Sequence, residues 1–144
     1  MKLDFWQYTH DPLEKVVALI AKRVLDEGAR LLIVSVDADQ RGAISRALWQ
    51  AGPDSFLANG EAAAPGAEAQ PILLSSDLNA SNRATHLILA DGVFRETDAF
   101  ARVFLLFPPD AASEARKAWR AHDGREDVKR AYFAQEDGRW VKKG

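Results

Sequence analysis

The spacing of apolar residues along the chain predicts alternating strands and helices. Leu3–Tyr8 alternates apolar and polar side chains, as a strand does, and in the turn that follows, Asp11 can cap a helix. Over Leu13–Glu27 the apolar residues recur at helical spacing, and Gly28 is placed to end that helix in a left-handed conformation. Leu31–Val36 is almost entirely apolar, which is typical of a strand covered on both faces of a parallel sheet. Together these segments predict a βαβ unit.

The pattern then repeats with further strands and helices. A second helix after Asp37-Ala38-Asp39 places Ile44, Ala47 and Leu48 on one face and stops at Gly52-Pro53. The other predicted helices are a short one that begins near Thr97 or Asp98 and the last main helix, Ala111–Ala121. The other predicted strands are a short edge strand Ser55–Leu57, then Ile72–Ser75, Thr85–Ala90, Val103–Phe107 and Val128–Ala134, and Arg139–Lys143 is expected to be a tail.

This alternation predicts an α/β fold. We expect a single three-layer α/β/α domain over residues 1–144, with a mostly parallel central sheet. Asp77–Arg83 is polar and too short for an ordinary crossover between parallel strands, so the sheet is expected to be mixed. The domain should carry a flexible loop near 59–70, which is rich in Gly, Ala, Glu and Pro, and a basic aromatic C-terminal segment, 114–144.

Composition narrows the class of protein. The 144 residues suit one core, and the absence of cysteine excludes disulfides, thiolate metal sites and cysteine nucleophiles. No apolar stretch approaches the ~20 residues of a membrane helix, and the first residues do not resemble a secretory signal. We therefore expect a cytoplasmic protein without a membrane partner.

Charge is distributed unevenly along the chain. Residues 114–144 hold nine Lys/Arg against six Asp/Glu, a net charge of +3, whereas residues 1–113 carry −5. The whole-chain charge of −2 argues against coating a nucleic acid, because non-specific affinity comes from neutralising many phosphates. A basic aromatic segment on an acidic body is instead suited to binding an acidic peptide or a phosphate chain.

Three aspartates near predicted strand ends are candidates for chemistry. Asp37, Asp39 and Asp91 could hold Mg²⁺ together, as in a small nucleotide-binding or phosphohydrolase enzyme, or they could be helix caps and a turn. The first predicted turn lacks a glycine fingerprint, and no P-loop motif occurs. The three histidines, His10, His86 and His122, have no catalytic or metal-ligand spacing. The sequence thus assigns no catalytic residue, metal or cofactor, and it favours a binding protein over an enzyme.

The last main helix has a different character. Arg116, Trp119 and Arg120 lie at i, i+3 and i+4 on one helical face, with Lys117 adjacent. Trp119 can be the core anchor of the helix, the wall of a binding pocket, or both. Further along, the aromatic residues can form the core face of a terminal strand or act as stacking platforms for bases; they are Tyr132, Phe133 and Trp140. Direct binding of single-stranded DNA through Trp119, Tyr132 and Trp140 is a further hypothesis.

Several short motifs, in order and at consistent distances, carry a family resemblance. They are Leu48-Trp49, Pro53-Asp54-Ser55-Phe56-Leu57, Asp91-Gly92, Ala115-Arg116 and Trp119-Arg120. With them the chain resembles the chi subunit family of bacterial DNA polymerase III over essentially its whole length.

The resemblance implies an accessory subunit associated with the clamp loader, with no catalytic centre of its own. It implies one surface for the acidic C-terminal tail of single-stranded DNA-binding protein and another for the psi subunit or the clamp loader, with DNA contact indirect or weak. The tail surface maps to Arg116, Lys117, Trp119 and Arg120, with Lys142 and Lys143 nearby; the psi or clamp-loader surface maps to Trp49, Phe56 and Leu57.

Two departures from the family pattern concern these surfaces. Ala112 stands where the family places a lysine one turn before Arg116, and Ala58-Asn59 replaces the usual Pro-His after the Ser-Phe pair. Ala112 leaves the basic surface with one positive charge fewer than the family pattern, and Ala58-Asn59 puts the psi partner in question.

Overall fold

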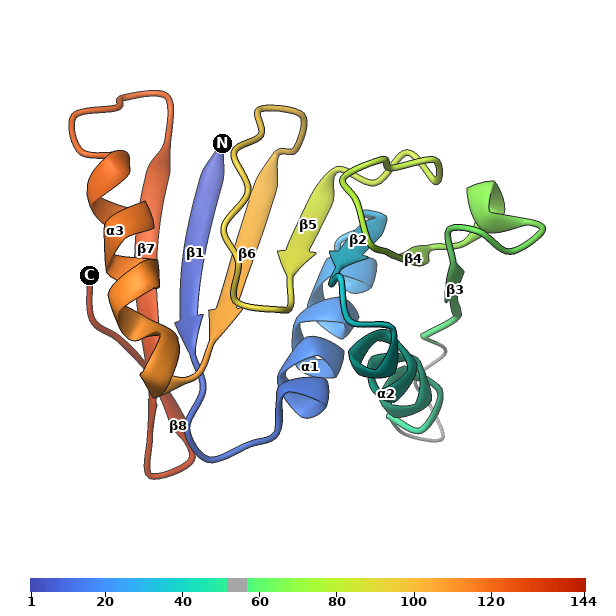
Figure 1. Cartoon of the computed structure of the whole chain (residues 1–144), viewed down its shortest axis with the longest axis horizontal. Helices are drawn as coiled ribbons and strands as arrows, with labels where there is room; N and C mark the ends of the chain where they lie inside the picture. Colours follow the sequence, from blue (N-terminus) through green and yellow to red (C-terminus); the bar gives the residue numbers. More distant parts are fainter. Residues whose placement is uncertain (52–56) are drawn as a thin grey trace.

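A computed structural model of the chain describes residues 1–51 and 57–144, and its centre is a single sheet (Figure 1). The strand order is β3-β4-β2-β5-β6-β1-β7-β8, and every pair is parallel except β7 with β8. The strands are β1 Lys2–Gln7, β2 Leu31–Val34, β3 Asn59–Glu61, β4 Ile72–Ser75, β5 His86–Leu89, β6 Arg102–Phe107, β7 Lys129–Glu136 and β8 Arg139–Lys142. The predicted α/β fold with a mostly parallel, mixed sheet is confirmed.

Helices cover both faces of the sheet. The α-helices are α1 Leu13–Asp26, α2 Ala38–Trp49 and α3 Ala112–Ala121, and η1 Ala67–Ala69 and η2 Pro109–Ala111 are short 3₁₀ helices. Alternate residues of each strand separate two cores: Leu31 and Ile33 pack with α1 and α2, whereas Leu32 and Val34 pack on the side of α3. The continuous apolar run of β2 therefore reflects a strand that is buried on both faces of the sheet.

The helix ends follow the predicted chemistry at two points and depart from it at one. Asp37 caps α2, accepting hydrogen bonds from the backbone N–H groups of Asp39 and Gln40, and Gly28 follows α1 with a φ of 80°. The expectation that Asp11 caps α1 is wrong. The N-cap of α1 is Pro12, because the carboxylate of Asp11 instead accepts a hydrogen bond from the side-chain amide of Gln135 at 2.8 Å.

Residues 57–71, which precede β4, are more structured than their composition suggests. Asn59–Glu61 forms the edge strand β3, and Asn59 and Ala67 are buried, so the expected loop near 59–70 contains a strand and a 3₁₀ turn. The predicted edge strand Ser55–Leu57 and the stop at Gly52-Pro53 fall largely or wholly outside the described residues.

The segment between β4 and β5 explains why the sheet is not mixed where the sequence predicted it. β4 and β5 are not neighbours: both pair in parallel with β2, which lies between them. The chain crosses over β2 without a helix, and Leu78, Ala80 and Ala84 pack against the core on the α3 side. The antiparallel pair is the hairpin of β7 and β8, in which Asp137 and Gly138 both have positive φ.

Two smaller predictions are also corrected. β2 ends at Val34, and Val36 is 66% exposed, because the chain turns there toward α2. The short helix expected near Thr97 or Asp98 is absent from the described chain. In this irregular connection to β6 the side chain of Arg95 turns back to the carboxylate of Asp91 at 2.8 Å, and the hydroxyl of Thr97 accepts a hydrogen bond from the N–H of Ala99.

Within residues 1–51 and 57–144, no helix is both long enough and apolar enough to cross a membrane.

Candidate functional site

The helix that carries the predicted basic face lies flat on the sheet. Its buried side chains are all alanines, Ala112, Ala115 and Ala118, which allow the helix backbone to approach the strands closely. The C-cap of the helix is His122, which is 1% exposed and whose Nδ1 lies 2.8 Å from the carbonyl oxygen of Ala118. The alanine at position 112, where the family pattern expects lysine, thus belongs to the core face of α3.

Trp119 anchors α3 to the sheet and still reaches the surface. Its ring packs edge-on against Phe5, with centroids 5.2 Å apart, and against Tyr132, with centroids 6.0 Å apart. The side chain is only partly buried. Trp119 is therefore a core anchor of α3 that also borders solvent, and its role as the wall of a binding pocket stays a prediction.

Arg130, on β7, is a residue that the sequence analysis did not single out. Its guanidinium carbon lies 4.4 Å from the centroid of the Trp119 ring, a cation–π arrangement. The same guanidinium donates hydrogen bonds to the backbone oxygen of Trp119 and to the carboxylate of Asp123, the latter at 2.8 Å. Arg130 and Tyr132 are two residues apart on β7, so their side chains lie on the same face of the strand. That spacing is the sequence signal that would have identified Arg130.

Arg116 and Arg120 are exposed on the flank of α3 that borders β7. Neither has a carboxylate oxygen within 4 Å among residues 1–51 and 57–144, whereas Arg130 is paired with Asp123. Burial raises the pKa of Tyr132, and the positive charge of Arg116 partly opposes this shift. Arg116, Trp119, Arg120, Arg130 and Tyr132 therefore form one basic aromatic surface, here called the α3 surface.

The other predicted members of this site are dispersed. Lys117 lies on the opposite flank of α3, where it pairs with Glu114 at 3.0 Å and borders a depression of about 390 Å³ next to Val93 and Phe94. Lys142 pairs in register with Phe133, so its side chain is on the α1 side of the sheet. Lys143 is on the α3 side, where its ammonium group contacts Glu136.

The second predicted surface is divided between exposed and buried residues. Trp49, at the end of α2, is 59% exposed, which is unusual for so large an apolar side chain. Leu57 is buried and lines a groove of about 500 Å³ between α1 and α2, together with Ala18, Leu19 and Ala47. Phe56 lies outside the described residues.

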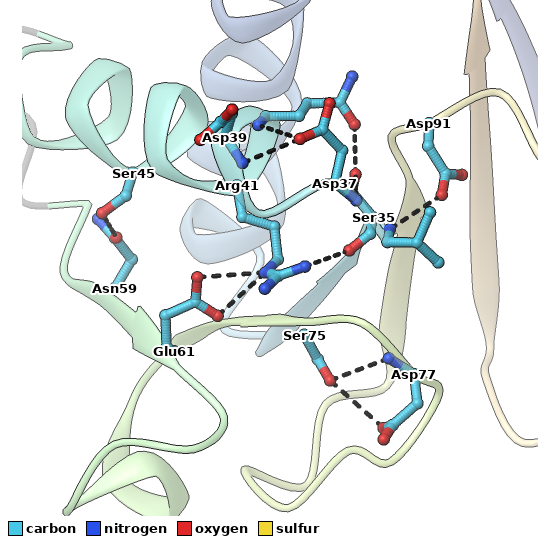
Figure 2. A network of polar contacts seen from close by, with 12 residues as sticks. Ser35, Asp37, Asp39, Arg41, Ser45, Asn59, Glu61, Ser75, Asp77 and Asp91 are labelled. Atoms are coloured by element: carbon cyan, nitrogen blue, oxygen red, sulfur yellow. Dashed lines mark hydrogen bonds and ion pairs between the residues drawn. The ribbon is translucent and has the colours of Figure 1, made fainter.

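Two of the three aspartates considered for Mg²⁺, Asp37 and Asp91, accept hydrogen bonds from the chain itself, whereas Asp39 is exposed (Figure 2). Asp37 accepts hydrogen bonds from the backbone N–H groups of Asp39 and Gln40, at 2.9 and 3.3 Å. Asp91 accepts one from the N–H of Val36 at 3.1 Å. It also pairs with both guanidinium Nη atoms of Arg95. No group of three metal-ligating side chains occurs in the part of the chain that the structure describes.

The turn after β1 is also closed to ligands. In doubly wound folds, backbone N–H groups at such a turn often bind phosphate. Here the N–H groups of Thr9, His10 and Asp11 all donate to one oxygen, the Oε1 of Gln135, at 2.9–3.1 Å. Gln135 is only 4% exposed, and its own side chain thus occupies the position of an anion.

These features define an α/β domain in which Asp37, Asp91 and the turn after β1 have partners within the chain, and in which α3 carries exposed arginines beside the partly buried Trp119. The family model of the DNA polymerase III chi subunit, HolC, matches residues 1–126, and this chain belongs to that family. Membership makes it an accessory component of DNA polymerase III in DNA replication. The matched region includes α3 and ends before β7, and a search among curated proteins found no match.

Proposed function

We propose that this chain links DNA polymerase III to single-stranded DNA-binding protein by binding that protein's acidic C-terminal tail at the α3 surface. The observation that carries the proposal is the pair of exposed arginines, Arg116 and Arg120, without carboxylate partners among the described residues and beside the half-buried Trp119. An acidic peptide with a free terminal carboxylate and an apolar last residue needs guanidinium groups for its charges and an apolar wall for that side chain.

A bridging role further needs a second surface, and we propose for it Trp49 together with the groove between α1 and α2. This surface would bind psi or another component of the clamp loader. α1 and α2 pack on the face of the sheet opposite α3, so two partners bound at these places would not compete for space.

The test of the tail site is a calorimetric titration with a synthetic tail peptide at low and moderate salt. Arg116→Ala should weaken binding about 10-fold or more, since a charge-assisted hydrogen bond contributes about 1.5–3 kcal/mol. The matched control is Arg23→Ala, which removes an exposed arginine from the last turn of α1 on the other face of the sheet. Equal affinity of Arg116→Ala and wild type would show that the site assignment is wrong.

The test of the second surface is co-purification with psi or with clamp-loader subunits. Trp49→Ala should reduce capture of that partner and leave tail-peptide affinity unchanged. Loss of both activities together would point to a folding defect, which the circular dichroism spectrum of the variant would reveal, and retention of both would remove Trp49 from the surface.

A further inference from the structure

A polar cleft on the α3 side of the sheet, distant in sequence from the α3 surface, gathers two arginines from separate loops. Arg30 precedes β2, and Ser81 and Arg83 belong to the segment between β4 and β5. With Glu68 of η1 these residues line a cleft of about 490 Å³. That size suits a ligand as large as a nucleotide.

The guanidinium of Arg30 is held in place without being neutralised. Its Nη1 donates hydrogen bonds to the backbone oxygens of Glu68 and Asn82, at 3.0 and 3.1 Å. Carbonyl oxygens fix the position of a guanidinium but carry no net charge. Most arginines that the structure holds in place are paired with a carboxylate instead, at 3.3 Å or less: Arg41, Arg95, Arg102, Arg125 and Arg130.

Arg83 is presented from a loop that is fixed by a buried side chain. Asn82 is 0% exposed; its amide donates to the backbone oxygens of Leu31 and Gln70, and its Oδ1 accepts from the N–H of Ala84. Arg83 itself is exposed and has a φ of 62°, a conformation that is uncommon for a residue with a side chain. Neither Arg83 nor Arg30 has a carboxylate oxygen within 4 Å in residues 1–51 and 57–144.

We propose that this cleft binds a phosphate group, with Arg30 and Arg83 supplying the charge and Ser81 a hydroxyl donor. Two guanidiniums and a hydroxyl match the several acceptor oxygens of phosphate, and guanidinium geometry favours bidentate contact with it. The carboxylate of Glu68 borders the same cleft and lowers its net charge. The phosphate can be part of a nucleotide or of a nucleic-acid backbone, because both present the same chemistry to the arginines.

The experiment follows the backbone amide signals of the ¹⁵N-labelled full chain by NMR during titration with inorganic phosphate, a nucleoside monophosphate and a short single-stranded oligonucleotide. Saturable shifts at Ser81, Arg83 and Ala84 are expected. Arg83→Asn should raise the dissociation constant about 10-fold or more, because it removes a charged donor. Asparagine also tolerates positive φ, so the loop should keep its conformation. Glu68→Gln should lower the dissociation constant, and the matched control Arg23→Asn should leave it unchanged.

The pattern across ligands and variants decides the proposal. Tight binding of the oligonucleotide alone identifies a nucleic-acid backbone as the ligand, and binding of the monophosphate identifies a small phosphate ester; both support the site. The proposal is overturned by the absence of saturable shifts at the cleft in the folded wild type. It is equally overturned if inorganic phosphate binds with no response to Arg83→Asn or Glu68→Gln, because that result would mean an adventitious ion only. The cleft lies apart from α3, so tail-peptide binding is measured in a separate experiment. The outcome of that experiment does not alter the conclusion about phosphate binding.

Discussion

The guanidinium of Arg130 lies over the ring of Trp119 and also donates a hydrogen bond to the backbone oxygen of Trp119. One side chain on β7 therefore contacts both the indole ring and the backbone of Trp119. This contact joins the end of α3 to the strand beside it. The orientation of the indole in the α3 surface therefore depends on a residue outside the helix.

Replacement of Arg130 should loosen that junction. Arg130→Ala removes a cation–π contact and hydrogen bonds, so we expect the free energy of unfolding to fall by about 1–2 kcal/mol in urea titrations. Arg139→Ala, at an exposed position on β8, is the control and should change it by less than about 0.5 kcal/mol. Equal effects of the two variants would show that the Trp119 contact contributes nothing to stability.

The dispersal of the predicted basic residues predicts unequal effects on tail binding. Lys117 lies on the other flank of α3 and Lys142 on the other face of the sheet, so alanine at either should change tail-peptide affinity by less than about twofold at moderate salt. Arg120→Ala should resemble Arg116→Ala. A strong effect of Lys142→Ala would indicate that the tail follows β8 instead of α3.

The position of Arg116 is testable through the ionisation of Tyr132. Burial raises the pKa of Tyr132, and Arg116 opposes that shift because a nearby cation stabilises the phenolate. Arg116→Ala should therefore raise the pKa of Tyr132 further. A ¹³C NMR titration of the tyrosine rings would separate Tyr132 from Tyr8, with Arg23→Ala as the control. An unchanged Tyr132 would place Arg116 away from β7.

Asp91 should make folding stability depend on acid. Burial opposes its ionisation, but hydrogen bonds from Arg95 and from the N–H groups of Val36 and Val93 outweigh burial, and the pKa lies below its ordinary value of 3.8. A lowered folded pKa adds stability above the unfolded pKa, and that stability is lost as pH falls through the folded value.

Asp91→Asn should accordingly lower the free energy of unfolding by about 1–3 kcal/mol at pH 7. Its difference from wild type should begin to shrink below about pH 4, where the carboxylate of the unfolded state becomes protonated, and should vanish once the pH falls below the lower folded pKa. Urea titrations at several pH values would measure this, with the exposed Asp98→Asn as the control. A difference that does not vary with pH would mean that the charge of Asp91 is not what stabilises this turn.

The hairpin of β7 and β8 should respond to its glycine. Gly138 has a φ of 77°, so Gly138→Ala should lower the free energy of unfolding by about 1–2 kcal/mol. Gly42→Ala, inside α2, should instead raise it by up to about 1 kcal/mol, because alanine favours a helix interior and the added Cβ would lie 3.6 Å from the nearest side-chain atom, on Arg46. A Gly138→Ala variant as stable as wild type would contradict the assigned turn.

Local signals predicted the local structure well. The helical spacing of Leu13–Glu27 and the continuous run at β2 identified α1 and a buried strand because each pattern depends on neighbours in sequence. The Asp137-Gly138 pair is itself a strong hairpin signal, and it would have predicted β8 had it been read as a turn. Arg130 was missed because β7 shows only weak alternation, with six consecutive partly buried or exposed residues before Gln135.

Long-range arrangement could not be predicted from these patterns. Gln135 fills the turn after β1, which is more than 120 residues earlier in the chain, and nothing near Thr9 indicates it. Nor does spacing reveal that Lys142 and Arg116 lie on different faces of the sheet. The family resemblance supplied a role for α3, but the separation of the cations depends on strand register, which is a property of the folded sheet.

The position of β1 in the sheet has a consequence for synthesis of the chain. β1 lies between β6 and β7, which begin at Arg102 and Lys129. β1 therefore cannot pair with its neighbouring strands until these later parts of the chain have been synthesised. During that interval Leu3, Phe5 and Trp6, all buried in the finished protein, are without their neighbours. A ribosome adding about 5–20 residues per second leaves this apolar strand unpaired for several seconds or more. Such non-local pairing slows folding and exposes β1 to association with other chains until β6 and β7 are complete.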